Sequence, residues 1–354
     1  MVEASINLSA LRHNARIAQD LAPDSALMAV IKANAYGHGM VPVAQALESI
    51  ADGFAVARIE EAMTLRRAGV GKRLLMMSSR PDARQLQQCA DLGIDIVVHD
   101  IETARLIAEH NIAPALGIWL KIDTGMHRLG VPPQHAAAIF QLLQASASVR
   151  ETILMSHFAS ADDQQVDTTE RQLQCFNTAT SGLDAPASIA NSAAIITRRD
   201  CHRDWIRPGI MLYGANPLGE KAQPSLQAVM TLRSQLLAVR DIGTGEGVGY
   251  NHAWTSKRPT RIGTVAVGYG DGYPRHACNG TPVLVNGQRV PLVGRVSMDT
   301  ITVDLSEQAQ AQAGDEVILW GDALAVNEIA AHAGTIAYEL LTQVTGRANY
   351  VYRG

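Results

Sequence analysis

The sequence predicts an α/β fold, in which a (β/α)8 barrel of the TIM type is followed by a mostly β C-terminal domain. Eight short apolar runs alternate with amphipathic stretches between Ala26 and about Leu212, as repeated βα units do. After Pro224 the alternation gives way to segments rich in β-branched residues. The length of 354 residues suits two domains, or one large barrel with an appendage. A doubly wound parallel sheet stays open as an alternative for the first part.

The eight apolar runs are the expected barrel strands. They occupy residues 26–31, 53–57, 73–77, 94–98, 116–122, 152–156, 187–190 and 205–212. Helical patterns with clear ends lie between several of them. The segment 59–69 ends on Gly69, and the segment 100–111 begins at Asp100 and ends on Asn111, as helix caps do.

The part after Pro224 is typical of a second, mostly β domain. Its β-rich segments are 225–242, 260–272, 281–296, 300–305 and 315–320. Asn286-Gly287 predicts a hairpin turn, and one helix pattern covers residues 325–347. We therefore predict a barrel over residues 1–224 and a β-rich domain over residues 225–354.

Composition narrows the class of protein. With 47% hydrophobic and 18% charged residues and a net charge of -4, the chain has no basic footprint for nucleic acid or an anionic membrane surface. We expect no secretory signal and no membrane-spanning segment. The four cysteines are scattered without a CxxC pair, which argues against a metal site and favours reduced thiols in a cytoplasm.

Polar residues follow the predicted strands at their carboxyl ends, where barrel enzymes carry their chemistry. The set after the first, fifth, sixth, seventh and eighth strands comprises Lys32, Lys121, Arg128, His157, Asn191, Ser192, Arg207, Gly209 and Ile210. For a single lysine such as Lys32, a solvated position at a strand end is the ordinary alternative. The combination favours a site.

The seventh and eighth strand ends predict a phosphate site. Ser192 offers a hydroxyl there, and Gly209 and Ile210 offer backbone N–H groups. A lysine facing a bound phosphate across a barrel mouth is the arrangement that pyridoxal phosphate requires, because the lysine amine forms a Schiff base with its aldehyde. Lys32 is that lysine in this interpretation.

Eight motifs make the sequence resemble the alanine racemases over essentially its whole length. They are VIKANAYGHG, LKIDTGMHRLG, MSHFASAD, DWIRPGIMLYG, VGYN, GYGDGYPR, VGRVSMD and TIAYEL. The resemblance implies a pyridoxal-phosphate enzyme that interconverts L-alanine and D-alanine. It leaves open whether the enzyme supplies D-alanine for peptidoglycan or catabolises D-alanine.

The resemblance implies a reaction with two bases, because one proton leaves Cα on one face and another returns on the opposite face. Lys32 is the first base and Tyr250 of the VGYN motif is the second. A phenol is a poor base at neutral pH unless its anion is stabilised, and His157 and Arg207 are the candidates for a hydrogen-bonded chain that does so. The alternative for Tyr250 is a packing residue.

In the family, Arg207 faces the pyridine nitrogen of the cofactor. A permanent guanidinium disfavours protonation of that nitrogen, which weakens the ring as an electron sink and limits transamination. The alternative is that Arg207 only pairs with Asp204 or another acid.

The resemblance also assigns the binding residues. The cofactor phosphate is bound by Tyr36, Ser192, Gly209, Ile210 and Tyr338, and the substrate carboxylate by Arg128 and the backbone N–H of Met298. Lys121 is often carbamylated in relatives, and an ordinary lysine paired with Asp123 is the alternative.

The resemblance further implies a head-to-tail homodimer in which each site takes Lys32 from one chain and Tyr250 from the other. Tyr269 and Asp271 line the entrance in the family, and an ordinary β-turn is the alternative for them. The remaining histidines, including His38, His99 and His276, are interpreted as structural or surface residues.

Three other functions stay open. A decarboxylase of basic amino acids would share Lys32 and the phosphate loops, but Arg207 and the Tyr250 motif argue against it. A non-catalytic pyridoxal-phosphate carrier would need neither Tyr250 nor Met298. A racemase with a broader substrate range is the third.

Overall fold

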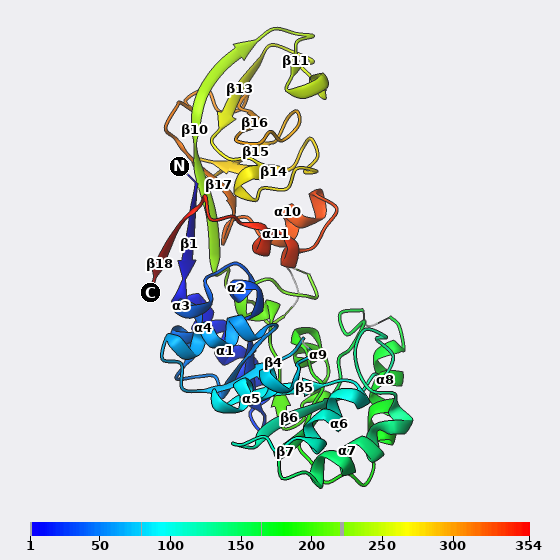
Figure 1. The fold of residues 1–354 in the computed structure, drawn as a ribbon. Coiled ribbons are helices and arrows are strands. Elements are labelled where there is room, and N and C mark those ends of the chain that lie inside the picture. The colour runs from blue at the N-terminus through cyan, green and yellow to red at the C-terminus, as the bar shows by residue number, and fades with distance from the viewer. Residues whose placement is uncertain (1, 79, 164, 220–222) are drawn as a thin grey trace.

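The computed structural model describes residues 2–78, 80–163, 165–219 and 223–354. These residues form a barrel and a β-rich region that lie end to end (Figure 1). The eight parallel barrel strands form one sheet in the order β8-β7-β6-β5-β4-β3-β2-β9. Their bounds are β2 Ala26–Val30, β3 Gly53–Val56, β4 Arg73–Met76, β5 Ile94–Val98, β6 Leu116–Lys121, β7 Val149–Met155, β8 Ala187–Ser188 and β9 Trp205–Ile206. A strand lies at each of the eight predicted positions. The eighth, predicted over 205–212, ends at Ile206, because a 3₁₀ helix occupies Ile210–Tyr213.

The two edge strands of this sheet meet. The Ser188 hydroxyl of β8 donates to the Trp205 carbonyl of β9 at 2.8 Å, and the Arg207 N–H donates to the Ala190 carbonyl at 3.0 Å. The barrel is therefore nearly closed. Because β2 to β8 neighbour one another in chain order and β9 returns to β2, the sheet has no switch point, which rules out the doubly wound alternative.

Helices follow most of the strands. The α-helices of this part are α1 Leu8–Leu21, α3 Met40–Leu47, α4 Ile59–Arg67, α5 Ala83–Asp91, α6 Ile101–Glu109, α7 Ala136–Gln144, α8 Thr168–Ala179 and α9 Ser192–Thr197. The helices predicted at 59–69 and 100–111 are confirmed as α4 and α6. Asp100 caps α6, because its carboxylate accepts the Thr103 N–H at 2.7 Å.

The second region is built on the long strand β10, which pairs with β1, β13 and β17. Its strands are β1 Glu3–Asn7, β10 Met230–Ile242, β11 Gly247–Val248, β12 Trp254–Thr255, β13 Thr260–Val265, β14 Pro282–Val285, β15 Gln288–Pro291, β16 Ile301–Asp304, β17 Glu316–Trp320 and β18 Asn349–Arg353. The predicted hairpin turn joins β14 to β15, with φ of 49° at Asn286 and 78° at Gly287.

Two features of this region differ from the prediction. The single helix expected over 325–347 is two helices, α10 Val326–His332 and α11 Ala337–Gln343, because Gly334 adopts a left-handed φ of 64° between them. The first strand, β1, pairs antiparallel with β10 and parallel with β18, so it lies in the second sheet although it precedes the barrel in the chain. A five-residue strand carries no local signal of its partner. The boundary near Pro224 stays a prediction.

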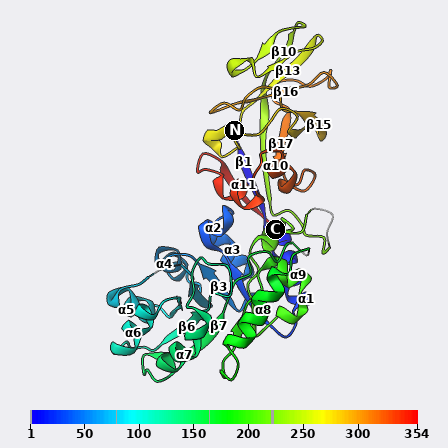
Figure 2. The ribbon, with the colours of Figure 1, turned by 90° about the vertical axis from the view of Figure 1, so that its right-hand side faces the viewer.

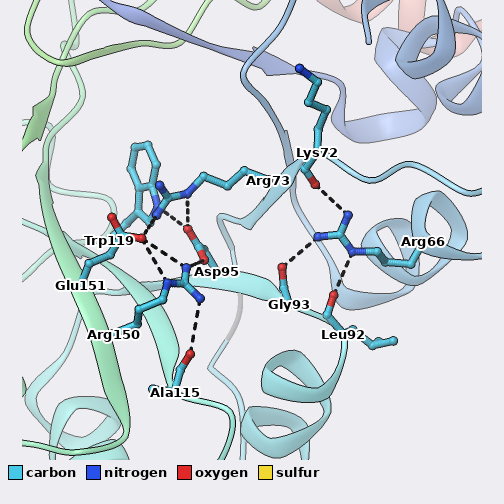
Figure 3. A network of polar contacts seen from close by, with 10 residues as sticks. All are labelled: Arg66, Lys72, Arg73, Leu92, Gly93, Asp95, Ala115, Trp119, Arg150 and Glu151. Atoms are coloured by element: carbon cyan, nitrogen blue, oxygen red, sulfur yellow. Dashed lines mark hydrogen bonds and ion pairs between the residues drawn. The ribbon is translucent and has the colours of Figure 1, made fainter.

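The barrel is closed at the amino ends of its strands by a network of ion pairs (Figure 3). The Asp95 carboxylate of β5 meets Arg73 of β4 at 2.5 Å and Arg150 of β7 at 2.9 Å. The Arg73 guanidinium also lies over the rings of Trp119 and Trp205, 5.7 Å and 5.2 Å from their centroids. This network lies at the opposite end of the strands from the residues predicted to form a site.

One continuous cluster of buried apolar side chains runs through both regions, from Trp119 in the barrel to Trp320 in β17. Helix α11 of the second region packs onto the segment that follows β2, at the mouth of the barrel (Figure 2). Within the described ranges, no helix combines the length and apolar character that crossing a membrane requires.

Candidate active site

A cavity of about 800 Å³ opens at the carboxyl ends of the barrel strands, and residues before and within α11 cover one side of it. Eleven of the residues predicted for the site line this cavity: Lys32, Tyr36, Lys121, Arg128, His157, Asn191, Ser192, Arg207, Gly209, Ile210 and Tyr338. They come from the carboxyl ends of five strands, β2, β6, β7, β8 and β9, and from α11. The structure thus brings together side chains that are far apart in the sequence.

Lys32 directly follows β2 and begins a short turn, α2 Lys32–Tyr36. Ala33, Asn34, Ala35 and Tyr36 all have φ between 52° and 55°, so the turn is left-handed. Burial and the positive charge of Arg128 lower the pKa of Lys32, while the negative charge of Glu61 raises it. The turn therefore delivers an amine that loses its proton more easily than an exposed lysine does.

Glycine is required where this turn ends. Gly37 has a φ of 83°, and a Cβ there would lie 2.1 Å from the Leu341 carbonyl oxygen of α11. The close approach of α11 to this turn is possible only without a side chain.

One part of the cavity is suited to a phosphate group. The Ser192 hydroxyl oxygen accepts the Gly209 N–H at 2.9 Å and the Met211 N–H at 3.4 Å, and its own proton has no acceptor among the described residues. The Ile210 N–H lies in the first turn of a 3₁₀ helix, where backbone N–H groups have no hydrogen-bond acceptor within the helix. A Cβ on Gly209 would lie 2.7 Å from the Tyr36 hydroxyl, so only glycine leaves this space open.

Tyr36 is held in place by aromatic contacts. Its ring stacks on Tyr213 with centroids 4.7 Å apart, and it lies 5.9 Å from the ring of Tyr338. On the other side of Tyr213, His38 stacks at 4.6 Å. His38 is fully buried and its Nδ1 lies 3.0 Å from the Tyr36 carbonyl, which confirms its interpretation as a structural residue.

Arg207 is buried and has no acidic partner in the part of the chain that the structure describes. Its guanidinium donates to the Ser188 hydroxyl and to the Ser156 carbonyl, both at 2.6 Å, and lies 3.4 Å from Nδ1 of His157. The alternative of an Arg207–Asp204 pair is wrong, because the Asp204 carboxylate accepts the Ala187 N–H instead. Burial lowers the pKa of Arg207 to about 10.

Lys121 lies among other cations. Burial, Arg207 and Arg128 lower the pKa of Lys121 to about 8. The Asp123 carboxylate is engaged by the N–H groups of Gly125 and His127, at 3.1 Å and 3.0 Å, and it forms no ion pair with Lys121 within the described residues. The alternative of an Asp123-paired lysine is therefore wrong.

Two predicted site residues lie elsewhere. Tyr250 and Met298 belong to loops of the second region, where their side chains are 68% and 53% exposed, and neither lines the cavity of its own chain. Tyr269 lies beside the loop of Met298, and its N–H donates to the Ser297 carbonyl at 3.1 Å. Asp271 is buried and accepts the Gly268 N–H, as the β-turn alternative for it requires.

Glu61 is a residue of the site region that the sequence analysis missed. Its carboxylate accepts the N–H of Ala33, directly after Lys32, at 2.7 Å. The sequence shows only an acid in the first turn of a predicted helix, which is a common capping arrangement. Four further cavity residues within or next to α11 were not predicted either: Thr335, Ile336, Glu339 and Thr342.

Comparison with known proteins agrees with this geometry. Residues 6–217 match the family model "Alanine racemase, N-terminal domain", and residues 229–352 match "Alanine racemase, C-terminal domain". The chain belongs to the alanine racemase family. The resemblance inferred from the eight motifs is thus confirmed.

Relatives within the family are similar over their whole length. The alanine racemase of Pectobacterium carotovorum is 49% identical over 99% of this chain and 98% of its own, and the biosynthetic alanine racemase of Escherichia coli K12 is 48% identical over 98% of each. The solved biosynthetic alanine racemase of Pseudomonas aeruginosa superposes with a TM-score of 0.97 at 45% identity, covering 100% of this chain and 99% of its own.

One solved family member bears on the cofactor. The alanine racemase of Bartonella henselae, solved with covalently bound pyridoxal phosphate, has a TM-score of 0.91 and 30% identity over 99% of both chains. The cavity of the present chain offers the same kinds of groups that this cofactor needs, an amine at a strand end and a set of phosphate donors.

Proposed function

We propose that this chain interconverts L-alanine and D-alanine with pyridoxal phosphate bound in the barrel cavity. The observation that carries the proposal is the presence, in one cavity, of the Lys32 amine, the phosphate donors around Ser192 and the buried Arg207 guanidinium, which meets no acid among the described residues. When bound, pyridoxal phosphate would supply an aldehyde for the substrate amino group and an electron-withdrawing ring that makes the Cα proton acidic. The residues of the chain then have to move that proton between two faces.

Lys32 and Tyr250 are the proposed bases on the two faces. The lowered pKa of Lys32 increases the fraction of neutral amine, which is the form that can accept a proton. The neutral His157 imidazole accepts a hydrogen bond from Arg207 at Nδ1, which leaves the proton on Nε2. This Nε2–H is free to donate to the phenolate form of Tyr250 and so to stabilise it.

Arg207 is proposed to face the ring nitrogen of the cofactor, and Arg128 with the Met298 N–H to bind the substrate carboxylate. A guanidinium cannot accept a proton from a pyridine ring and repels a proton on that nitrogen. The absence of an acid near Arg207 in the described structure supports this assignment.

Lys121 is proposed to be a carbamate in the active protein. With a pKa of about 8, about a tenth of its amine is neutral near pH 7 and can attack carbon dioxide, forming an N–C bond and releasing one proton. The resulting anion would neutralise the cations Arg128 and Arg207. Carbon-13 NMR after incubation with labelled bicarbonate tests this, with Lys121→Gln as the control.

A homodimer with shared sites is part of the proposal. The cavity of one chain contains Lys32 but not Tyr250 or Met298, which stay exposed on the second region. A second copy placed head to tail would bring these two residues to the cavity and cover them. The four cysteines are all free, which suits a reducing compartment, and we propose the cytoplasm.

The experiment is an assay of the purified protein, with pyridoxal phosphate, against a panel of L-amino acids. We expect loss of optical rotation with L-alanine and formation of D-alanine, and weaker activity with larger side chains. Carbon dioxide release from a basic amino acid would favour the decarboxylase, and no turnover of any amino acid would favour the carrier. The biosynthetic relatives favour D-alanine supply, which a strain requiring D-alanine would test by growth rescue.

A further inference from the structure

Glu61 connects two adjacent barrel units at the mouth of the cavity. It lies in the first turn of α4, where its carboxylate accepts the N–H groups of Ala57 and Arg58 at 2.8 Å and 3.1 Å. These two bonds are an ordinary helix cap. The other carboxylate oxygen leaves the helix and accepts the Ala33 N–H at 2.7 Å. One carboxylate thus ties the start of α4 to the residue after Lys32.

The backbone after Lys32 needs such support. Four consecutive residues without a glycine among them, Ala33 to Tyr36, have a left-handed φ of 52–55°. Each such residue is disfavoured by about 1–2 kcal/mol relative to a right-handed one. Backbone hydrogen bonds hold the turn internally, such as the one from the Gly37 N–H to the Ala33 carbonyl at 3.0 Å. Its ends are held in addition, at Gly37 by the close packing of α11 and at Ala33 by the Glu61 carboxylate.

The electrostatic surroundings of Lys32 give Glu61 a second effect. The other ionisable groups that act on the Lys32 amine from the described residues are Arg128, Lys121 and His157, of which the first two are cations. Glu61 is the acid in this set. No ion pair joins it to the amine within the described residues, so it acts through the Ala33 backbone and through the field across the mouth of the barrel.

We propose that Glu61 is a positioning residue for Lys32, because it anchors the backbone that directs the amine into the cavity and supplies the negative charge that offsets the surrounding cations. This role of Glu61 extends the proposed function. It depends on that function only for the statement that Lys32 transfers protons. The anchoring of Lys32 by Glu61 stands independently of the reaction.

The test compares Glu61→Gln with Glu60→Gln. Both acids lie in the first turn of α4, but the Glu60 side chain is exposed, so the second variant removes the same charge from the same helix end. Both full-length variants and the unmodified protein are freed of cofactor with hydroxylamine. Hydrogen exchange at the Ala33 amide and acetylation of Lys32 by trace acetic anhydride across a pH series are then measured by mass spectrometry.

In Glu61→Gln we expect the Ala33 amide to exchange roughly tenfold faster. The amide side chain has one acceptor oxygen, so it can no longer accept hydrogen bonds from Ala33 and from the start of α4 with two separate oxygens. We expect Lys32 to be acetylated roughly threefold faster on the acidic side of its titration, because loss of a nearby anion favours the neutral amine. Glu60→Gln should change neither quantity. Glu61→Asp keeps the charge on a shorter stem, so it should accelerate exchange and leave acetylation close to the unmodified protein.

Equal behaviour of Glu61→Gln and Glu60→Gln in both measurements would overturn the proposal. If Glu61→Gln does not fold, Glu61→Asp decides, and unchanged exchange at Ala33 in that variant would overturn it. Neither readout involves alanine or the cofactor. A protein with the expected exchange and acetylation but no racemisation would therefore disprove the proposed function and leave the role of Glu61 intact.

Discussion

The Arg207 guanidinium lies 3.4 Å from Nδ1 of the His157 imidazole, and both side chains are held inside the barrel. Burial, and then the charge of Arg207, lowers the pKa of His157 well below its usual range. His157 is therefore neutral at physiological pH, and the permanent positive charge of the pair belongs to Arg207.

Replacement of Arg207 by glutamate should divert the reaction. A carboxylate at this position favours a proton on the cofactor ring, which strengthens the ring as an electron sink and gives transamination time to compete. We expect slower racemisation and a slow release of pyruvate from alanine, measured with a coupled dehydrogenase. Arg199→Glu, an exposed site with the same change of charge, is the control. An unchanged rate of pyruvate release would place Arg207 away from the ring nitrogen.

Tyr250→Phe should separate the two bases. Phenylalanine cannot transfer a proton, so we expect Cα proton exchange in deuterium oxide to fall by roughly a hundredfold or more for one enantiomer of alanine and much less for the other. Cα proton exchange must be measured because racemisation rates cannot separate the two bases. The two enantiomers of alanine have equal free energy, so kcat/KM for racemisation must be equal in both directions. Proton NMR measures the exchange, with Tyr350→Phe as the control. Equal losses for both enantiomers would argue for a single base or a packing role.

Mixing Lys32→Ala with Tyr250→Phe should restore activity if two copies share the site. In a mixed dimer one site receives both defects and the other receives none. Random pairing makes half of the dimers mixed, so activity should rise from near zero to roughly a quarter of the unmodified protein. Size-exclusion chromatography of differently tagged subunits must first show that they have exchanged. A flat result after proven exchange would mean that each site is complete within one chain.

Acid should destabilise the protein partly through His38. Burial lowers the pKa of His38 to about 4, so below its ordinary pKa the unfolded chain binds a proton that the folded chain does not. Stability should therefore fall as pH falls, by about 2 kcal/mol from this group between pH 7 and pH 5. Urea unfolding of His38→Asn, which keeps a donor for the turn carbonyls, should show a weaker pH dependence. His276→Asn, an exposed site, should show the full dependence.

The ion-pair network at the amino end of the barrel should govern stability and not catalysis (Figure 3). Asp95 has only 2% of its side chain exposed, and its removal leaves Arg73 and Arg150 with the more exposed Glu151 carboxylate as their shared acid. We expect Asp95→Asn to lower the free energy of unfolding by about 3 kcal/mol. Gly117→Ala should act similarly, because its Cβ would lie 2.2 Å from the Asp95 carboxylate. Urea denaturation measures both.

The more exposed Glu151, replaced by glutamine, is the control and should cost much less than Asp95→Asn. Racemisation by folded Asp95→Asn at low temperature should match the unmodified protein. A large loss of racemisation without a loss of stability would contradict the assignment of this end of the barrel to structure.

The barrel could be predicted because its signals are local. The strand runs consist mainly of apolar residues, as Gly53–Val56 does throughout, since both faces of a barrel strand are covered, and several helices carry their own cap, as α6 does with Asp100. The site residues at the strand ends could be predicted for a related reason. Once strands are parallel and consecutive, their carboxyl ends meet, so Lys32 and Ser192 could be placed at one site without coordinates.

Other features depended on contacts between distant parts of the chain. The pairing of β1 with β10 and β18 joins residues more than 200 positions apart, and no local pattern distinguishes it. The role of Glu61 at Ala33 is equally hidden, because a capping acid looks the same in the sequence whether or not its second oxygen reaches another loop. The split of the last helix at Gly334 depended on a backbone conformation that glycine permits but does not require.

The sequence by itself determined the alternation of strands and helices in the barrel, the family and the chemical groups of the site, because periodicity, caps and motif spacing are properties of neighbouring residues. Only the tertiary structure decided how those groups act on one another. It removed Asp204 and Asp123 as partners of Arg207 and Lys121, and it left Tyr250 outside the cavity of its own chain. Charge, burial and reach are set by what surrounds a side chain in space, and folding alone assembles that environment.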